Sequence, residues 1–481
     1  MTEKFEYDGF WWLPGNSDEQ IPGTLTFDPT QGAFLKLLDS FSEWREEPLS
    51  SDIKCDIVLG ISINNQITLY NCRKTKQVLG GYFRPSTIFA ETVLVDNHFC
   101  KKEDITFRRV IVDYSNLDEW VNISGFDSKL LAKAYDDFKS KREFNVAYRY
   151  PELSENRAVI DSLGEVYLSI AIKLPSSDFV QKEVYIKQSA KICIKLKEKR
   201  SLLDYKAVID KIQNFLSLGV SSPVCPVSIK GFLLEENSKS LPISIYYRLP
   251  NVPKIDGNIL PNQMLFNLSD LSGDFAQYLK RWFDKYDLLE PTFKNYFGII
   301  HTPGINRMNE LLFTNQFLNL MQAIESYHAK RYGDEGQYQS DEEYFNRLYP
   351  RLTDFLYSLP TDIIDSDFRD NLVKNSFKYL HHHSLRKRFK NIFKRFENTI
   401  SNKIGNTDKE MNNFINKAVT TRNYYTHLGE MSEDVVNSNR ELQKISAKLA
   451  FLIELCFLYE LEISEDVIKK IVSRNKNYYF D

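Results

Sequence analysis

Hydrophobic residues alternate with polar ones through the first half of the chain, which is typical of half-buried β-strands. Segments of this kind, bounded by turn-forming Gly, Pro and Asn, occur at 10–13, 24–27, 56–63, 66–70, 92–95, 105–112, 157–173, 182–197, 226–235 and 241–248. Asn64-Asn65 separates two of them and predicts a hairpin. Residues 116–120 predict a short helix, and 202–217 carry apolar positions at helical spacing. The first half is therefore predicted to be β-rich.

The pattern becomes helical toward residue 300. Residues 258–297 already carry a helical stripe, and alternation ends beyond a boundary that we place at 298–304. Further helices are predicted at 306–331, 342–358, 366–380, 384–396, 411–425, 435–461 and 465–473. We expect Ser384 to cap the fourth of these, Gly429 to stop the fifth, and Ser432-Glu433-Asp434 to cap the sixth.

The predicted class is α+β, with a β-rich domain at 1–300 followed by an all-α bundle at 301–481. A division of the first domain into two subdomains near 130–155 is one option. The net charge of the 481 residues is −3, so any nucleic-acid footprint must be local. Six scattered cysteines without a CxxC pair fit a reducing compartment. With neither a signal-peptide pattern nor a long apolar run, we expect a cytoplasmic protein without a membrane segment.

Metal ligation is the weaker interpretation of the histidines and cysteines. Cys100 and His98, with Cys55 or Cys72, offer ligand atoms, but their spacing matches no recognised ligand set. The run 381–383 is all histidine, and consecutive side chains on a helix point in different directions. We therefore predict no metal and no cofactor, while a metal at the four residues near the N-terminus stays open.

A basic segment lies inside the predicted bundle. Residues 371–400 carry eight basic side chains against one acidic, Glu397, a net charge of +7; they are Lys374, Lys378, Arg386, Lys387, Arg388, Lys390, Lys394 and Arg395. The segment is either a solvated helix face or a track that binds phosphates.

The candidate chemical site is Arg422–His427. Asn423 lies one helical turn before His427, and a long arginine side chain can reach the same pocket. Histidine can move a proton near neutral pH, and a guanidinium matches the geometry of phosphate. These groups suit metal-free RNA cleavage, in which the ribose 2′-hydroxyl attacks the adjacent phosphate and leaves a 2′,3′-cyclic phosphate and a 5′-hydroxyl. The alternative is an Arg and a His that merely cap a helix end.

The motif and its surroundings resemble a known family. Arg422-Asn423-Tyr424-Tyr425-Thr426-His427 resembles the R-x4–6-H signature of HEPN ribonucleases. The first half resembles the N-terminal domain of ApeA anti-phage defence proteins, on the segments Gly9-Phe10-Trp11-Trp12-Leu13-Pro14-Gly15, Pro22-Gly23-Thr24-Leu25, Asp104-Ile105-Thr106-Phe107 and Leu117-Asp118-Glu119-Trp120. Leu385-Arg386-Lys387-Arg388-Phe389 also fits that family, whereas residues 130–260 match it less clearly.

The resemblance implies an abortive-infection ribonuclease with Arg422, Asn423 and His427 as its catalytic residues. We expect Arg386, Lys387, Arg388 and Tyr425 to contact RNA, with tRNA as one candidate. It also implies a homodimer through the helical domain, and an N-terminal domain that senses infection, with a phage protein as a candidate trigger, or restrains the nuclease. The opposing hypothesis is a HEPN module that binds RNA or a protein without cutting. A metal-dependent hydrolase is disfavoured because no clustered carboxylate or histidine set is apparent.

Overall fold

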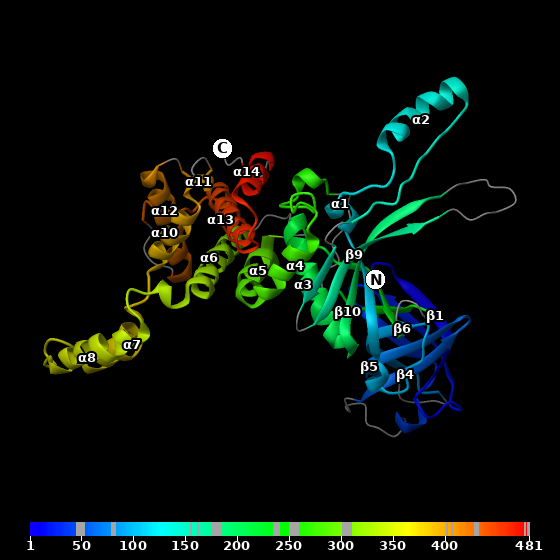
Figure 1. Ribbon diagram of the computed structural model, residues 1–481. Helices are drawn as coiled ribbons and strands as arrows, with labels where there is room; N and C mark the ends of the chain where they lie inside the picture. The colour runs from blue at the N-terminus through cyan, green and yellow to red at the C-terminus, as the bar shows by residue number, and fades with distance from the viewer. Residues whose placement is uncertain are drawn as a thin grey trace. The chain divides into compact units, whose positions relative to one another are not determined.

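The computed structural model describes residues 1–44, 53–77, 83–153, 156–160, 163–174, 185–233, 241–249, 259–300, 310–400, 403–405, 407–427, 432–475 and 478. The chain forms two compact units, Met1–Phe283 and Asp284–Asp481 (Figure 1). The first is built on a β-sheet and the second is helical, so the predicted α+β class is confirmed. The units divide at Phe283, whereas the predicted boundary at 298–304 starts in the last residues of a helix and otherwise falls outside the described residues.

The strands of the first unit belong to one antiparallel sheet in the order β3-β2-β1-β4-β5-β6-β12-β11-β7-β10-β9-β8. Their bounds are β1 (Phe5–Trp12), β2 (Ile21–Asp28), β3 (Gly32–Leu37), β4 (Lys54–Ser62), β5 (Asn65–Gln77), β6 (Ser86–Val95), β7 (Thr106–Tyr114), β8 (Arg157–Ile160), β9 (Gly164–Lys173), β10 (Lys187–Ser201), β11 (Pro226–Phe232) and β12 (Ile243–Tyr247). The hairpin predicted at Asn64-Asn65 joins β4 to β5.

The first six strands close on themselves because β3 also pairs with β6. One part of β6, 86–90, pairs with β3, while the part 92–95 pairs with β12 and continues the sheet. Buried side chains fill the closed part, with Trp11 fully enclosed. Gly60 lies opposite Trp11, and a Cβ there would come within 2.2 Å of the indole ring. Trp11 and Phe27 are therefore core residues, whereas Phe10 is exposed.

Helix α3 (Leu202–Val220) contacts β7 and β10 in the second part of the sheet. It starts with a capping box between Ser201 and Asp204, and the Tyr205 hydroxyl donates to the Phe107 carbonyl at 3.2 Å. Strand β7 precedes the predicted subdomain division near 130–155, yet it lies between β10 and β11, which follow it. The division therefore does not separate two subdomains, because strands from both sides share one hydrogen-bonded sheet.

The remaining helices of the first unit are α1 (Leu117–Val121), α2 (Ser128–Lys141) and α4 (Phe275–Asp284). The sequence pattern predicts α1 and α4 but not α2, most of whose side chains are exposed. Trp120 on α1 packs edge-on against Phe215, Phe266 and Phe275, so α1, α3 and α4 share a core.

Helix α6 organises the second unit, because α5, α10, α12 and α13 all contact it. The helices of this unit are α5 (Tyr286–Ile300), α6 (Glu310–Tyr332), α7 (Asp341–Glu343), α8 (Tyr349–Ser358), α9 (Ser366–Asn371), α10 (Leu385–Arg395), α11 (Glu397–Ile400), α12 (Asp408–His427), α13 (Asn439–Glu460) and α14 (Glu465–Arg474). Within the described chain, no helix combines the length and apolarity needed to cross a membrane.

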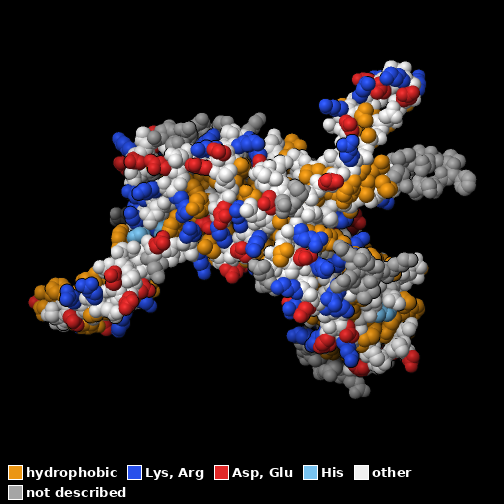
Figure 2. All heavy atoms as spheres, in the orientation of Figure 1, with side chains coloured by type: hydrophobic (Ala, Val, Ile, Leu, Met, Phe, Trp, Pro, Cys, Tyr) orange, Lys and Arg blue, Asp and Glu red, His pale blue; other side chains and the backbone are white. Residues whose placement is uncertain are grey.

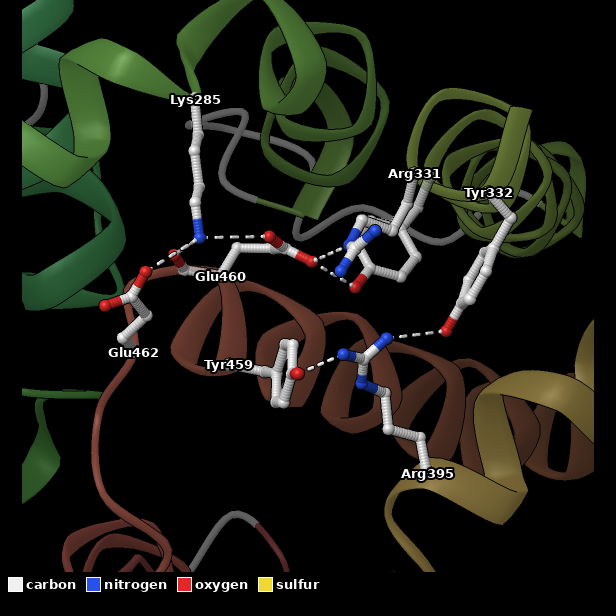
Figure 3. A network of polar contacts seen from close by, with 8 residues as sticks. Lys285, Arg331, Tyr332, Arg395, Tyr459, Glu460 and Glu462 are labelled. Carbon is white, nitrogen blue, oxygen red and sulfur yellow. Dashed lines mark hydrogen bonds and ion pairs between the residues drawn. The ribbon is translucent and has the colours of Figure 1, made fainter. Parts of the chain in front are cut away.

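Polar side chains tie these helices together inside the bundle (Figure 3). The buried carboxylate of Glu460 on α13 accepts hydrogen bonds from Tyr327 and Arg331 of α6, both at 2.9 Å. Lys285 lies 3.3 Å from the same carboxylate and 3.4 Å from that of exposed Glu462. Arg395 on α10 donates to the hydroxyls of Tyr332 and Tyr459. The network therefore connects α6, α10 and α13.

Two predicted helices are interrupted. The predicted helix 342–358 consists of α7, the π-helical turn η5 (Tyr344–Leu348) and α8. The predicted helix 366–380 consists of α9, a second π-helical turn η6 (Leu372–Ser376) and the 3-10 turn η7 (Phe377–Tyr379). We refer to residues 341–383 as the lobe. Its own hydrophobic cluster has three buried members, Leu356, Ile364 and Val373.

The predictions for the helix ends have different outcomes in the structure. Ser384 caps α10 by accepting the Lys387 N–H, as predicted. The prediction for Ser432-Glu433-Asp434 is wrong, because α13 starts later and Ser438 is its cap. Residues 432–434 instead form a turn that ends with a Val435 N–H to Ser432 carbonyl bond of 3.0 Å. The proposed stop at Gly429 lies outside the described residues.

Candidate nucleolytic site on helix α12

Helix α12 carries the candidate motif on its last two turns. Its buried positions Phe414, Ile415, Ala418 and Val419 fix the helix against the bundle. Buried Thr421 anchors the next stretch of chain, because its hydroxyl accepts the Val436 N–H at 2.9 Å. Asn423 and His427 are exposed and lie one turn apart, which puts them on the same side of the helix. The motif therefore starts at a rigid buried anchor and ends in solvent.

Arg422 is half-buried and held from two sides. Its Nη2 lies 3.3 Å from Oε1 of Glu325 on α6, and its Nη1 donates to Oδ1 of Asn423 at 3.3 Å. A phosphate that binds this guanidinium must compete with the Glu325 carboxylate. Glu325 was not identified from the sequence, because it is on a different helix and far from the motif along the chain. No spacing rule connects the two positions.

Tyr425 has a structural role in the described chain. Its ring packs edge-on against Tyr424 at 5.2 Å, and its hydroxyl donates to the Val436 carbonyl at 3.3 Å. The half-buried ring therefore helps fix the turn before α13. The RNA contact that we expected of Tyr425 would have to use the exposed remainder of the ring.

The structure brings one predicted RNA-binding arginine to the motif helix. Arg386, in the first turn of α10, donates to Asn416 Oδ1 and Thr420 Oγ1 of α12, both at 3.1 Å. Lys387 is exposed, whereas half-buried Arg388 donates to the His383 carbonyl at 3.1 Å.

The basic residues of 371–400 do not all lie in one track with Arg386, although Lys390 and Lys394 follow it at one-turn spacing on the exposed side of α10. Lys374 pairs with Asp370 at 3.1 Å, and Arg395 belongs to the bundle network. Figure 2 shows basic and acidic side chains mixed over the visible face of the helical unit. The charge of the segment thus divides between structural pairs and the exposed side chains of α10.

The four metal ligands considered near the N-terminus are not brought together as one set, although two of them are neighbours. His98 Nε2 contacts the Gly60 carbonyl at 2.8 Å, and Cys100 is exposed. Cys55 and Cys72 face each other across β4 and β5, and burial raises the pKa of the Cys72 thiol well above its ordinary range. Among the described residues, the group whose atoms could share an ion is instead Asp341, His381 and His382.

The helical conformation predicted for the histidine run 381–383 is wrong. Residues 381–383 were assumed to be helical, so that their side chains would diverge. They lie in the turn between η7 and α10, and His382 forms an antiparallel bridge with Gln337. An extended backbone in this turn allows His381 and His382 to approach the same carboxylate.

A helical bundle with an Arg-x4-His motif on an exposed helix end, preceded by a β-rich unit, is the architecture of a HEPN protein with an accessory domain. The family model described as ApeA N-terminal domain 1 matches residues 6–282, and the one described as Apea-like HEPN matches residues 318–467. The chain belongs to the ApeA family, an anti-phage family whose HEPN domain is of a nuclease-associated type. Neither the curated proteins nor the solved structures contain a significant match to the chain.

Proposed function

We propose that this protein is a metal-independent endoribonuclease of a bacterial abortive-infection system. The observation that carries the proposal is that α12 bears both Arg422, which Glu325 holds in place, and an exposed His427. Both lie inside the segment that matches the Apea-like HEPN family. Anti-phage nucleases are the functional context of that family.

The proposed chemistry needs two groups. His427 takes the proton of the ribose 2′-hydroxyl or returns one to the departing 5′-oxygen, and Arg422 neutralises the charge that develops on the phosphate. Asn423 orients the guanidinium through its Oδ1. The products are a 2′,3′-cyclic phosphate and a 5′-hydroxyl, and DNA is spared because it lacks the 2′-hydroxyl.

The electrostatics of one copy do not favour phosphate. The carboxylate of Glu325 offsets Arg422, and the carbonyl end of α12, which terminates at His427, carries partial negative charge. A second copy that adds another Arg422 and His427 would supply the missing positive charge. We therefore include a homodimer through the helical unit in the proposal, with tRNA as a candidate substrate and the cytoplasm as its location.

The N-terminal unit would restrain the nuclease or sense infection, for which a phage protein is a candidate trigger. The alternative is a HEPN module that holds RNA or a protein without cutting it. It is favoured by the Arg422–Glu325 ion pair, since a paired arginine is also a structural element.

The test is RNA cleavage and phage protection by the full chain carrying His427→Ala. We expect cleavage to fall by about 100-fold or more, with an unchanged circular dichroism spectrum. Exposed Arg440 on α13 provides a control, because Arg440→Ala should cleave normally. Cleavage by the wild type should continue in EDTA. Undiminished cleavage by the folded His427→Ala variant would reject the assignment, and RNA binding without cleavage by the wild type would favour the alternative.

A further inference from the structure

Side chains from the first and the last residues of the lobe lie close together at its base. Asp341 is the first residue of α7, and His381 and His382 precede α10. One ligand atom from each of the three lies within 4.8 Å of the others. The closest contact joins His381 Nε2 to Asp341 Oδ1 at 2.7 Å.

His381 is buried and held in place, with 1% of its side chain exposed. Its ring stacks on Tyr344 with centroids 4.2 Å apart, and the Tyr344 hydroxyl donates to the Phe377 carbonyl at 2.6 Å. Tyr344 opens the π-helical turn η5, so the irregular helix is what presents this ring to the histidine. The imidazole is therefore fixed before any ligand arrives.

Burial of this histidine is poorly compensated by the protein alone. Its Nδ1 finds no hydrogen-bond partner among the described residues, and its Nε2 faces a carboxylate that is 63% exposed. The neighbouring Gln337 likewise has a buried Oε1 without a partner in the described chain. Buried polar atoms normally have partners, so the unpartnered Gln337 oxygen beside these residues points to a group that the protein binds.

We propose that Asp341, His381 and His382 bind a divalent transition-metal ion, with zinc as the best match. Two imidazoles and a carboxylate are ordinary zinc ligands, and a water or the Gln337 amide oxygen completes a tetrahedral set. The ion binds the Nε2 lone pair of neutral His381, so the single proton of the imidazole moves from Nε2 to Nδ1 and none is lost. The 2.7 Å contact opens to about 3.3 Å when both atoms are roughly 2 Å from zinc. Exposed Asp341 can make that shift while His381 stays in place.

The ion has a structural reason to be there. The ligands join the two ends of the lobe, whose own cluster has three buried residues with four partly buried hydrophobic residues packed against it. Several of its large hydrophobic side chains are exposed instead, with Phe355 at 61%, Ile363 at 66% and Phe368 at 57%. A segment with so small a core gains stability when a metal closes it into a loop. The site is separate from Arg422 and His427, so it is compatible with metal-free RNA chemistry.

The test is zinc binding by the EDTA-dialysed full chain, measured by calorimetry and by the absorption spectrum of cobalt(II) in place of zinc. We expect one ion per chain and a loss of affinity of about 100-fold or more in Asp341→Asn, an exposed and isosteric change. His382→Ala should weaken binding similarly. Glu342→Gln and His383→Ala are matched controls, because each alters a neighbour of a ligand and should bind as the wild type does.

Hydrogen exchange supplies a second measurement, in which zinc should slow exchange across 341–382 in the wild type but not in Asp341→Asn. The proposal is overturned if the wild type binds no zinc, or if folded Asp341→Asn binds with unchanged affinity. Zinc held by cysteines elsewhere would give that second result. These measurements do not read cleavage, so they stand or fall independently of the ribonuclease assignment.

Discussion

Arg395 and Arg422 lie in the same helical unit, but their guanidinium groups have different surroundings. Arg395 donates to two tyrosine hydroxyls, and its guanidinium lies 3.7 Å above the Tyr459 ring. Arg422 has one carboxylate partner at 3.3 Å, and its neighbour Asn423 is exposed. The partners of Arg395 lie inside the bundle network, whereas those of Arg422 are a half-buried carboxylate and an exposed amide, each at 3.3 Å.

The two glutamates that serve these regions differ in the same way. Glu460 is 2% exposed and accepts from two side chains of α6 while Lys285 approaches it. Glu325 is 29% exposed and forms an ion pair with Arg422. Removing one member of a buried network leaves an uncompensated charge, while exposed pairs can be exchanged at little cost in stability. We therefore expect changes at Arg422 to reduce activity and changes at Glu460 to reduce stability.

The largest effect is expected at Arg422. Arg422→Ala should lower RNA cleavage by about 100-fold to 1000-fold, because it removes the donor that neutralises the phosphate in the transition state. Single-turnover cleavage by wild type and variant measures the loss. Arg351 on α8 is exposed, and Arg351→Ala is the control with normal cleavage. A folded Arg422→Ala protein with wild-type cleavage would contradict the proposed role.

The next effect concerns folding and is expected at Glu460. Glu460→Gln should reduce the free energy of unfolding by about 3 kcal/mol, because Arg331 and Lys285 lose their shared carboxylate inside the bundle. Urea unfolding measures the change. Glu462→Gln is a matched control: this carboxylate also pairs with Lys285 but is 56% exposed, so its loss should cost under about 1 kcal/mol. Equal losses would show that burial does not separate the two pairs.

A smaller effect on RNA affinity is expected from the exposed start of α10. Arg386→Glu with Lys387→Glu should weaken RNA binding by about tenfold, and the salt dependence of binding should become less steep. The binding assay uses the His427→Ala background, so that RNA is not cut. Lys469→Glu with Lys470→Glu on α14 makes the same change in net charge and is the control. If affinity is unaffected, these residues form a solvated face and do not bind RNA.

The smallest effect is a pH dependence of stability from His328 on α6. Burial, with a contribution from the nearby Arg388 charge, lowers the pKa of His328 to about 4. The unfolded chain then binds a proton near pH 6.5 that the folded chain does not take up until about pH 4. Stability is complete above pH 6.5 and falls as the pH is lowered toward 4. Urea midpoints at pH 7 and 5 measure this, and His328→Gln should show a smaller difference between them. An unchanged difference would mean that other groups dominate.

Much of the architecture follows from local pattern. Alternation predicted most strands of the closed sheet but not β3, helical spacing predicted α3 and α13, and Ser384 was recognised as a cap. Such features depend on neighbours in sequence, which carry the periodicity of a strand or helix and the chemistry of a turn. The motif residues on α12 were found for the same reason, since all lie within two helical turns.

The predictions that the structure contradicts depend on contacts between residues that are far apart in the sequence. The cap at Ser432 was misplaced because the Val436 N–H binds the Thr421 hydroxyl, a contact across two segments. The helix 342–358 was expected to be regular, but Tyr344 sits in a π-helical turn against His381. A division near 130–155 was considered because sequence order does not reveal that β7 lies between β10 and β11.

The sequence by itself determined the two-part α+β organisation, the family resemblance and the candidate residues Arg422, Asn423 and His427, because these are encoded in local periodicity and short spacing. Only the tertiary structure decided which charges have partners. It paired Arg422 with Glu325, brought Arg386 of α10 against α12, enclosed Arg395 among tyrosines, and brought Asp341 to His381 and His382. The physical reason is that burial and long-range contacts set the role of a charged side chain, and neither is a property of its neighbours in the chain.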